Sequence, residues 1–346
     1  YASTGAWGHV ESALKKNGID YLLYNKVTPN PTVDEVDEAV RQGRDFGAQA
    51  VIGIGGGSPI DASKTTAILL AYPDRNARDV YEFKFTPEKA VPIVAINLTH
   101  GTGTEVDRFA VVTIPEKQFK PAIAYDCVYP MFAIDDPQLM TGLPKNQTIY
   151  VSVDAVNHVV EASTSKVRSP YTVNLAKETV ELVAKYLPEA IKDPSNLEAR
   201  YYLLYASMIA GICFDNGMLH LTHALEHPLS GVKADITHGL GLGILLPAVI
   251  KQIYPAVPQI IAEIFSPINS ELKGEAGEAE KAADLVEKWL NSVGITEKLS
   301  DLGFKEQDVD KLVDLAFNTP SLSSLLSIAP VEATRKMVRQ IYSDSL

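Results

Sequence analysis

Residues 50–71, AVIGIGGGSPIDASKTTAILLA, decide the fold of this chain. Residues 50–54 are apolar and β-branched, as in a buried strand, and a helical pattern follows within a few positions. Between the two stand Gly55, Gly56 and Gly57. Three successive glycines carry no β-carbon, so backbone N–H groups can approach an anion at the start of the helix. The stretch predicts a strand, a diphosphate-binding loop and a helix.

The residues after the glycines carry the marks of a helix start. Ser58 is a suitable N-cap, Pro59 suits the first helical position, and Asp61 stands three residues after the cap, as in a capping box. The spacing differs from the G-x-G-x-x-G fingerprint of ordinary dinucleotide-binding folds. A glycine turn that only joins strand to helix is the alternative. A second loop, 97–106, also follows a predicted strand and is a candidate for the facing wall of the same crevice.

The pattern around this unit divides the chain in two. Further strand-like runs at 21–24, 91–96 and 110–114 alternate with helical patterns, which predicts a parallel sheet covered on both faces. After Pro144, apolar residues recur at spacings of three and four, which predicts an all-helical part. We therefore expect an α/β domain at residues 1–144 and a helical domain at residues 145–346.

Composition excludes several classes of protein. With 346 residues and 46% hydrophobic content, the chain can bury two cores, while its formal charge of −12 would repel nucleic acid. No apolar run is expected to cross a membrane, and the first twenty residues lack the features of a secretory signal, so we expect a cytoplasmic protein. Cys127 and Cys213 are too few for a disulfide framework and are expected to be buried thiols.

The histidines are strongly clustered. Asp154 and His158 are four residues apart on a predicted helix and therefore share a face. One carboxylate with several imidazoles suits Fe(2+) or Zn(2+) better than Ca(2+) or Mg(2+). A lone buried histidine is as often a core residue, but a cluster favours a metal. The spacing leaves open which four of these six side chains coordinate: Asp154, His158, His220, His223, His227 and His238.

A metal beside a dinucleotide predicts hydride transfer. The cation would act as a Lewis acid on an alcohol oxygen while hydride passes from carbon to nicotinamide. The sequence also resembles the iron-dependent (group III) alcohol dehydrogenases in segments that run in order along nearly the whole chain. These segments are TPNPT at 28–32, GGGSPIDASK at 55–64, THGTGTEV at 99–106, DDPQLMTGLP at 135–144, DAVNHVVEA at 154–162, and HALEHPL with THGLG at 223–241.

The resemblance implies the fold, the reaction and a set of site residues. The expected fold is a dehydroquinate synthase-like architecture, with an α/β dinucleotide-binding domain and an all-α metal-binding domain. The expected reaction interconverts primary alcohols and aldehydes with NAD(P)(H) and Fe(2+), with Zn(2+) as a possible substitute. His227 takes a non-ligand position near the nicotinamide, where a proton relay is expected. The implied metal ligands are Asp154, His158, His223 and His238. The implied coenzyme residues are Gly55, Gly56, Gly57, Ser58, Asp61, Thr99, Thr102 and Lys120, the last close to the nicotinamide ribose.

Several positions depart from the family pattern. His100 stands where a small residue is usual and His220 where glycine is usual, and we expect His220 to pack or to support the site. Asn25, beside Lys26, stands where members that prefer NAD place an aspartate. A neutral amide next to a cation favours a 2′-phosphate, so we predict NADP(H) over NAD(H).

Other readings remain open at this point. A glycerol or polyol dehydrogenase, or a dehydroquinate-synthase-like enzyme, would share the loop and the metal, but the apolar run 203–221 favours a simple alcohol or aldehyde. A dinucleotide sensor would carry the metal as a structural element and show no turnover. A homodimer is expected as the commonest soluble assembly. The family's first strand has no counterpart before residue 3, and a segment outside this sequence explains that better than a shortened fold, since the sheet edge would be exposed.

Overall fold

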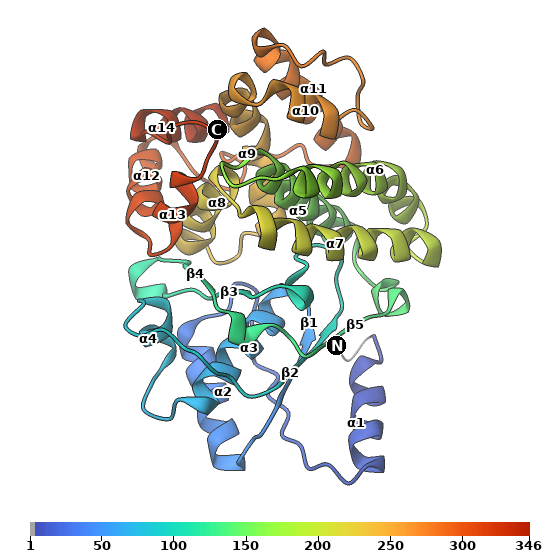
Figure 1. Cartoon of the computed structure of the whole chain (residues 1–346), viewed down its shortest axis with the longest axis vertical. Coiled ribbons are helices and arrows are strands. Elements are labelled where there is room, and N and C mark those ends of the chain that lie inside the picture. Colours follow the sequence, from blue (N-terminus) through green and yellow to red (C-terminus); the bar gives the residue numbers. More distant parts are fainter. Residues whose placement is uncertain (1–3) are drawn as a thin grey trace.

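The structure, a computed structural model that describes residues 4–346, has two halves (Figure 1). The lower half in Figure 1 holds a parallel sheet with helices, and the upper half is built from helices. This arrangement confirms the predicted fold class. Residues 1–3, where the match to the family was expected to begin, lie outside the described residues.

The parallel sheet places three loops at one edge. It contains β1 (Val51–Gly55), β2 (Ile93–Asn97) and β5 (Phe132–Asp135), in the order β1-β2-β5. Gly55 pairs with Asn97, and Asn97 pairs with Asp135, so the three strands end level with one another. The glycine loop and the loop that begins after Asn97 therefore leave the sheet side by side, where parallel sheets bind ligands.

The helices of this half bury part of the sheet's apolar surface. They are α1 (Ala6–Lys16), α2 (Val33–Phe46), α3 (Gly57–Ala71) and α4 (Ala77–Tyr81). Helix α3 packs on β1, β2 and α2. The predicted Ser58 cap is wrong, because α3 begins at Gly57 with Gly56 as its N-cap and no side-chain cap bond. Ser58 therefore lies inside the first turn, and Asp61 is used elsewhere.

Two of the predicted strands are corrected. Residues 21–24 form no strand, because their tyrosines are tied to helices: Tyr21 donates to Glu11 and Tyr24 to Glu38. The run at 110–114 forms only β3 (Phe109–Val111), which pairs antiparallel with β4 (Ala122–Ala124) in a separate two-stranded sheet. The sequence analysis did not predict β5.

Helices pack closely around α5 in the upper half. The helix predicted to carry Asp154 and His158 is confirmed as α5, which packs on α6, α7 and α9. Cys213 is buried in this core, as predicted, while Cys127 in the other half is only partly buried. The helices are α5 (Lys145–Thr164), α6 (Pro170–Lys192), α7 (Leu197–Gly217), α8 (Leu221–Val232), α9 (His238–Ile253), α10 (Pro258–Ile264), α11 (Ala279–Val293), α12 (Val309–Asn318), α13 (Leu322–Ser327) and α14 (Arg335–Asp344).

One helix of the core is apolar enough to cross a membrane. The segment His238–Ala256 meets the length and hydropathy of a span, which the sequence analysis did not expect, but 72% of it is buried within the protein. Helices α7 and α8 meet the same test only together, and they are bent by 107°. Burial against α5, α8 and α11 explains the hydropathy of α9.

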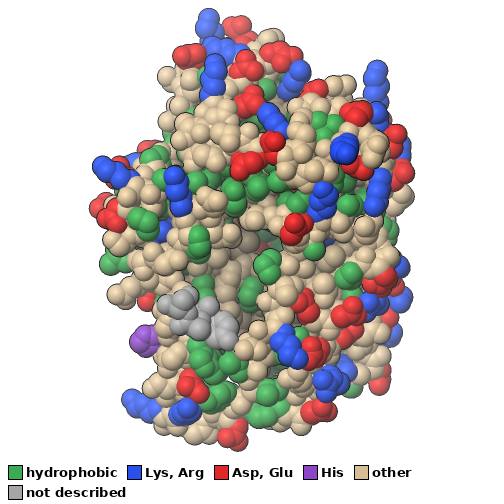
Figure 2. All heavy atoms as spheres, turned by 180° about the vertical axis from the view of Figure 1, so that it is seen from behind, with side chains coloured by type: hydrophobic (Ala, Val, Ile, Leu, Met, Phe, Trp, Pro, Cys, Tyr) green, Lys and Arg blue, Asp and Glu red, His purple; other side chains and the backbone are tan. Residues whose placement is uncertain are grey.

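Apolar side chains also reach the surface near the sheet. Ile52 on β1 and Phe132 and Ile134 on β5 are exposed. Figure 2 shows apolar side chains on the lower part of the rear face and a hollow between the two halves. The expectation about a first strand stays a prediction.

Candidate active site

The two predicted walls of the coenzyme crevice touch each other. A β-carbon on Gly56 would lie 2.8 Å from Cγ2 of Thr99, and one on Gly57 would lie 2.7 Å from Cγ2 of Thr102. A side chain at either position would clash with the threonine opposite, so both positions require glycine. The loop 99–102 lies directly against the start of α3, where free backbone N–H groups and the helix dipole favour an anion.

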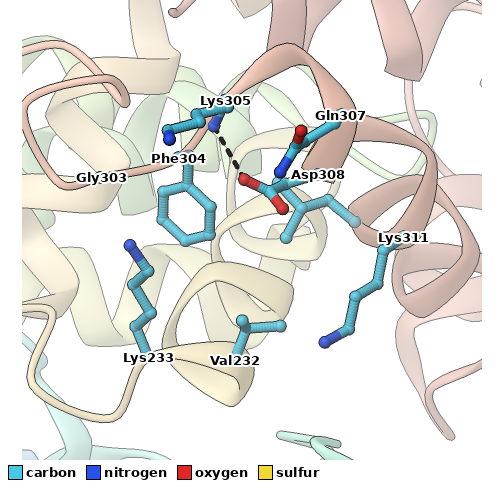
Figure 3. Close-up of a pocket in the computed structure, with 9 residues that line it drawn as sticks. Val232, Lys233, Gly303, Phe304, Lys305, Gln307, Asp308 and Lys311 are labelled. Atoms are coloured by element: carbon cyan, nitrogen blue, oxygen red, sulfur yellow. Dashed lines mark hydrogen bonds between the residues drawn. The ribbon is translucent and has the colours of Figure 1, made fainter.

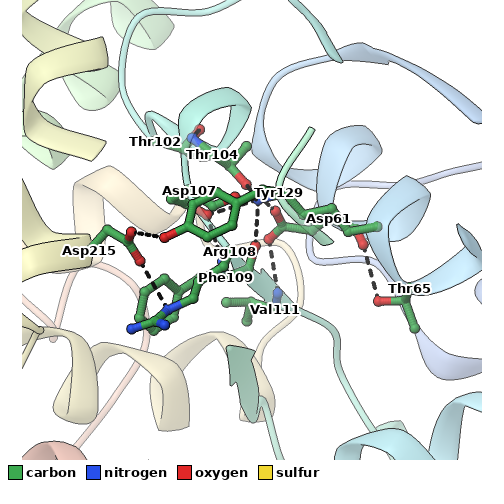
Figure 4. A network of polar contacts seen from close by, with 11 residues as sticks. Asp61, Thr65, Thr102, Thr104, Asp107, Arg108, Phe109, Val111, Tyr129 and Asp215 are labelled. Atoms are coloured by element: carbon green, nitrogen blue, oxygen red, sulfur yellow. Dashed lines mark hydrogen bonds and ion pairs between the residues drawn. The ribbon is translucent and has the colours of Figure 1, made fainter. Parts of the chain in front are cut away.

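Asp61 lies behind this loop and bonds to protein groups. Its two carboxylate oxygens accept hydrogen bonds from Thr104 Oγ1 at 2.7 Å and from the Val111 backbone N–H at 2.9 Å (Figure 4). The role implied for Asp61 was that of an acid facing the coenzyme. Its contacts instead join α3 to β3, and coenzyme contact by Asp61 stays a prediction.

Lys64, one turn further along α3, is a buried cation with a full set of acceptors. Its Nζ donates to Thr104 Oγ1 at 2.8 Å, to Asp107 Oδ1 at 2.8 Å and to the carbonyl oxygens of Asp107 and Phe109 at 2.9 and 2.7 Å. No hydrogen of this ammonium remains for a ligand. Lys64 therefore fastens the loop after η1 (Thr104–Val106) to α3.

The predicted metal ligands converge from three helices. Asp154 and His158 come from α5, His223 from α8 and His238 from the first turn of α9. Asp154 Oδ1 lies 3.5 Å from His158 Nε2 and 3.7 Å from His223 Nε2. Ligand atoms of Asp154, His223 and His238 all lie within 4.8 Å of one another. The rings of His158 and His223 stack at 4.7 Å.

Several atoms of this cluster are buried without a hydrogen-bond partner among the described residues. They include Asp154 Oδ1 and both ring nitrogens of His223. Burial opposes the ionisation of Asp154, but the imidazoles of His158 and His223 outweigh it and lower its pKa to about 2. Buried groups normally have partners, so these atoms fit a cation with one oxygen and several nitrogen ligands.

A second candidate cluster shares one histidine with the first. Ligand atoms of Glu226, His227 and His238 also lie within 4.8 Å of one another. Here a cation is already present, because Lys120 Nζ lies 3.5 Å from Glu226 Oε2. Glu226 is also bonded by Ser230 and His238. In the second cluster Glu226 and His238 are paired and only His227 Nδ1 lacks a partner, whereas the first cluster contains Asp154 Oδ1 and both ring nitrogens of His223 without one, so the first is the better metal site.

Glu161, to which the sequence analysis gave no role, and His220 support the histidine cluster. Glu161, fully buried on α5, accepts the backbone N–H of His223 at 2.9 Å and lies 3.3 Å from its Nδ1. Burial acts to lower the pKa of His223, but Glu161 and Asp154 raise it to about 9. As expected, His220 packs: its Nδ1 accepts from the Leu221 N–H, and its Nε2 lies 2.9 Å from Thr164 Oγ1. The sequence signal that could have identified Glu161 is its position three residues after His158, which places both side chains on one face of the helix.

Comparison with known proteins agrees with this geometry. Residues 1–137 match the family model for iron-containing alcohol dehydrogenase, and residues 148–346 match the model for the C-terminal part of the Fe-containing alcohol dehydrogenase family. The chain belongs to the iron-containing alcohol dehydrogenase family.

Relatives and solved structures of this family cover nearly the whole chain. A long-chain primary alcohol dehydrogenase of Thermoanaerobacter ethanolicus is 65% identical over 345 residues, covering 100% of this chain and 86% of the relative. An NAD-dependent methanol dehydrogenase of Bacillus methanolicus is 30% identical, covering 97% and 88%. The NADH-dependent butanol dehydrogenase A structure from Thermotoga maritima has a TM-score of 0.92 at 30% identity, covering 99% and 88%.

Family membership settles the reaction class. This iron-containing alcohol dehydrogenase is an oxidoreductase that interconverts alcohols and aldehydes with a nicotinamide coenzyme, as the sequence predicted. The findings give no support to the lyase or sensor alternatives.

An unexpected pair of buried residues, Arg200 and His100, joins the two halves of this alcohol dehydrogenase. Arg200, fully buried on α7, donates from Nη1 to Thr148 Oγ1 and to His100 Nε2, both at 2.9 Å. His100 Nδ1 lies 3.3 Å from Ser152 Oγ. Burial, reinforced by the Arg200 charge, lowers the pKa of His100 to about 3. His100, which differs from the usual family residue, thus connects the loop 99–102, the predicted second wall of the coenzyme crevice, to α5 and α7.

Lys26, which stands beside Asn25 at the position predicted to select the coenzyme, forms an ion pair. Lys26 Nζ lies 2.6 Å from Glu38 Oε1 on α2. Its charge is therefore partly neutralised, a contact that the sequence analysis did not anticipate.

One measurable cavity lies away from these residues. It has a volume of about 290 Å³ and lies between the end of α8 and residues 303–312, with Lys233, Lys305 and Lys311 on its walls (Figure 3). Lys233 Nζ donates to the Leu302 carbonyl oxygen and lies 4.4 Å from the Phe304 ring centroid. None of the predicted site residues lines this cavity.

Proposed function

We propose that Asp154, His158, His223 and His238 hold Fe(2+), or Zn(2+) in its place, at the reaction centre of this alcohol dehydrogenase. The unpaired ligand atoms of Asp154 and His223 in a buried cluster carry this proposal. The coenzyme is proposed to lie along Gly55, Gly56, Gly57 and Ser58, opposite Thr99 and Thr102, with Asp61 and Lys120 as further members of its site.

When bound, the ion supplies Lewis acidity to an alcohol oxygen. The residues of the chain handle the proton. His227 is buried on α8 and its Nδ1 has no hydrogen-bond partner among the described residues. Burial, reinforced by the Lys120 charge, lowers the pKa of His227 well below its usual value. The free Nδ1 near the metal cluster supports the proposal that His227 takes part in a proton relay from the alcohol.

Anaerobic metal removal tests this function. Aldehyde-dependent oxidation of NADPH and NADH is followed before chelation, after chelation and after addition of Fe(2+) or Zn(2+). We expect activity to disappear with the metal and to return with Fe(2+). Full turnover by protein shown to be metal-free by elemental analysis would contradict the proposal.

The preferred coenzyme is proposed to be NADP(H). The absence of a carboxylate at Asn25 and the neighbouring Lys26 support this choice, whereas the Lys26–Glu38 ion pair weakens it. Two relatives are named for NAD or NADH, so a direct comparison is needed. Asn25→Asp is expected to lower kcat/KM for NADPH about tenfold through repulsion of the 2′-phosphate, and Glu38→Gln is expected to raise it. Higher kcat/KM with NADH in the unsubstituted enzyme would contradict the choice.

The substrate is proposed to be a primary alcohol or aldehyde with an apolar chain. The Phe214 ring lies 4.6 Å from the His158 ring and 5.2 Å from the Phe109 ring, which gives the metal site an apolar neighbour. The 65% identical relative is named for long-chain primary alcohols. Each methylene buried contributes about 0.8 kcal/mol, so kcat/KM should rise about fourfold per carbon over the first few straight-chain aldehydes. A flat profile would contradict an apolar site.

Three further expectations are kept as proposals: a homodimer, a cytoplasmic location and a domain boundary between residues 144 and 145. Light scattering of the purified enzyme tests the first, fractionation of cells that express it tests the second, and limited proteolysis tests the third. No membrane and no nucleic acid partner is proposed.

A further inference from the structure

Glu226 is a buried carboxylate between the metal cluster and the α/β half. It lies on α8, fully buried, one residue before His227. Oε1 accepts a hydrogen bond from Ser230 Oγ, and Oε2 is bonded to His238 Nδ1. Because Nδ1 of His238 is directed at Glu226, Nε2 is the nitrogen that remains for Asp154, His223 and a metal. A carboxylate in this position fixes both the orientation and the tautomer of a ligating imidazole.

The space for this carboxylate is created by a glycine of α9. A β-carbon on Gly241 would lie 2.9 Å from Cγ and 3.2 Å from Oε1 of Glu226. Any larger residue at position 241 would push the Glu226 side chain away from His238. The contact is therefore built into the packing of α8 against α9.

The same carboxylate is reached from the other half of the molecule. Lys120, which precedes β4 in the α/β half, is buried and places Nζ 3.5 Å from Glu226 Oε2. Gly231 on α8 permits this approach, because a β-carbon there would lie 2.4 Å from the Gln118 carbonyl oxygen. The loop that carries Lys120 is thus pressed against α8. A residue of the coenzyme half and a metal ligand share one carboxylate.

We propose that Glu226 is a positioning residue that directs Nε2 of His238 toward the metal, and that Lys120 holds Glu226 from the α/β half. The inference rests on the proposed function, since it takes His238 as a metal ligand. Lys120 has been expected only near the nicotinamide ribose; its contact with Glu226 gives it a second role. The affinity for the metal then depends on the contact between Lys120 of the α/β half and Glu226 of the helical half.

Metal affinity is the first test, because it does not depend on turnover. Apoenzyme is titrated with Co(2+), whose visible absorption reports ligand geometry, and with Zn(2+) in competition with a chromophoric chelator. Glu226→Gln is expected to weaken binding 10- to 100-fold and to change the Co(2+) spectrum. Glu226→Asp keeps the charge and should recover part of the affinity. Parental affinity and spectrum in Glu226→Gln would overturn the inference.

A double-mutant cycle tests the role of Lys120. Lys120→Met is expected to raise the Zn(2+) dissociation constant of the parent enzyme. In the Glu226→Gln background the same substitution should change this constant by less than about twofold, because residues in contact show non-additive effects. Equal effects in both backgrounds would overturn the link through Glu226. Ser230→Ala is the matched control, because it removes one donor to the same carboxylate and leaves the Lys120 and His238 contacts in place.

His238→Ala separates this inference from the proposed function. Loss of Zn(2+) affinity in His238→Ala but not in Glu226→Gln would overturn the positioning role alone. Parental affinity in His238→Ala would overturn the ligand assignment and the positioning role together.

A measurement on the unsubstituted enzyme covers the case in which the Glu226 variants fail to fold. In the zinc-loaded protein, ¹⁵N spectra of histidine side chains distinguish a protonated nitrogen from a metal-bound one. We expect the His238 ring, identified by its absence in His238→Ala or His238→Gln, to carry its proton on Nδ1 and the metal on Nε2. A metal on Nδ1 would overturn the inference.

Discussion

The two halves of the molecule each bury a cluster of charged side chains, but the two clusters are completed in different ways. In the α/β half, Lys64 Nζ has acceptors from Thr104, Asp107 and Phe109. In the helical half, Asp154 Oδ1 and the ring nitrogens of His223 have no hydrogen-bond partner among the described residues. The first cluster contains a fully paired cation, although Asp107 Oδ2 and the carboxylate of the neighbouring Glu105 lack partners there, whereas in the second a carboxylate and imidazoles meet without a cation between them.

This difference separates a structural network from a ligand site better than residue type does. Both clusters contain buried carboxylates and basic groups, and both include residues from segments of the sequence that resemble the family. Buried polar groups without partners are costly, so a cluster in which several unpaired atoms able to bind a metal lie within 4.8 Å of one another is expected to be completed by a ligand. The same criterion favours the first of the two metal candidates that share His238, because Glu226 in the second is already paired.

Removal of a metal ligand should give the largest effect. Asp154→Asn takes the carboxylate from the incomplete cluster, and kcat/KM is expected to fall by three to four orders of magnitude, since the metal contributes several kcal/mol to the reaction. Metal content per folded chain, measured by elemental analysis, should fall with it. Retention of both would place the ion elsewhere and break the comparison.

Removal of Lys64, the cation of the cluster in the α/β half, should lower the free energy of unfolding. Lys64→Met leaves Asp61 and Asp107 buried without their cation, and the free energy of unfolding is expected to fall by about 3–5 kcal/mol. Denaturant unfolding measures the loss. Metal content per folded chain should stay at the parental level, which makes this variant the control for Asp154→Asn. Loss of metal without loss of stability would show that the Lys64 network serves the site directly.

These contrasts also explain what sequence could and could not predict. The glycine loop and the grouping of the proposed ligands on α5 and α8 could be predicted, because their spacing is local to one loop or one helix face. The long-range partners of Lys64, Arg200 and Glu226 could not, since Lys64 lies 43 residues from Asp107, Arg200 lies 100 from His100 and Glu226 lies 106 from Lys120 along the chain.

The strand errors have the same origin. Residues 21–24 have strand-like composition, but hydrogen bonds from Tyr21 and Tyr24 to helices hold them outside the sheet. The short β5 has only its pairing with β2 to mark it as a strand. Pairing depends on distant segments, which local composition does not report.

A smaller effect is expected where the two halves meet at His100. Its pKa is lowered to about 3 by burial and then by Arg200. Below pH 6.5 the unfolded chain therefore takes up a proton that the folded chain refuses, and the free energy of unfolding falls as the pH drops toward 3. His100→Gln should reduce this dependence by up to about 1.4 kcal/mol per pH unit. Urea unfolding at pH 6.5 and 5.5 measures it.

Exposed His9 provides the control for that experiment. His9→Gln removes a histidine whose side chain lies in solvent and outside the contact between the halves. An equal change in both variants would show that the His100–Arg200 contact does not hold the ring neutral.

The most direct test of the central claim is anomalous diffraction at the iron edge from crystals grown anaerobically with Fe(2+) and NADP(H). The incomplete cluster predicts one peak bounded by Asp154, His158, His223 and His238, with the nicotinamide beside it. A peak between Glu226, His227 and His238, or no peak within reach of Asp154, would contradict the account.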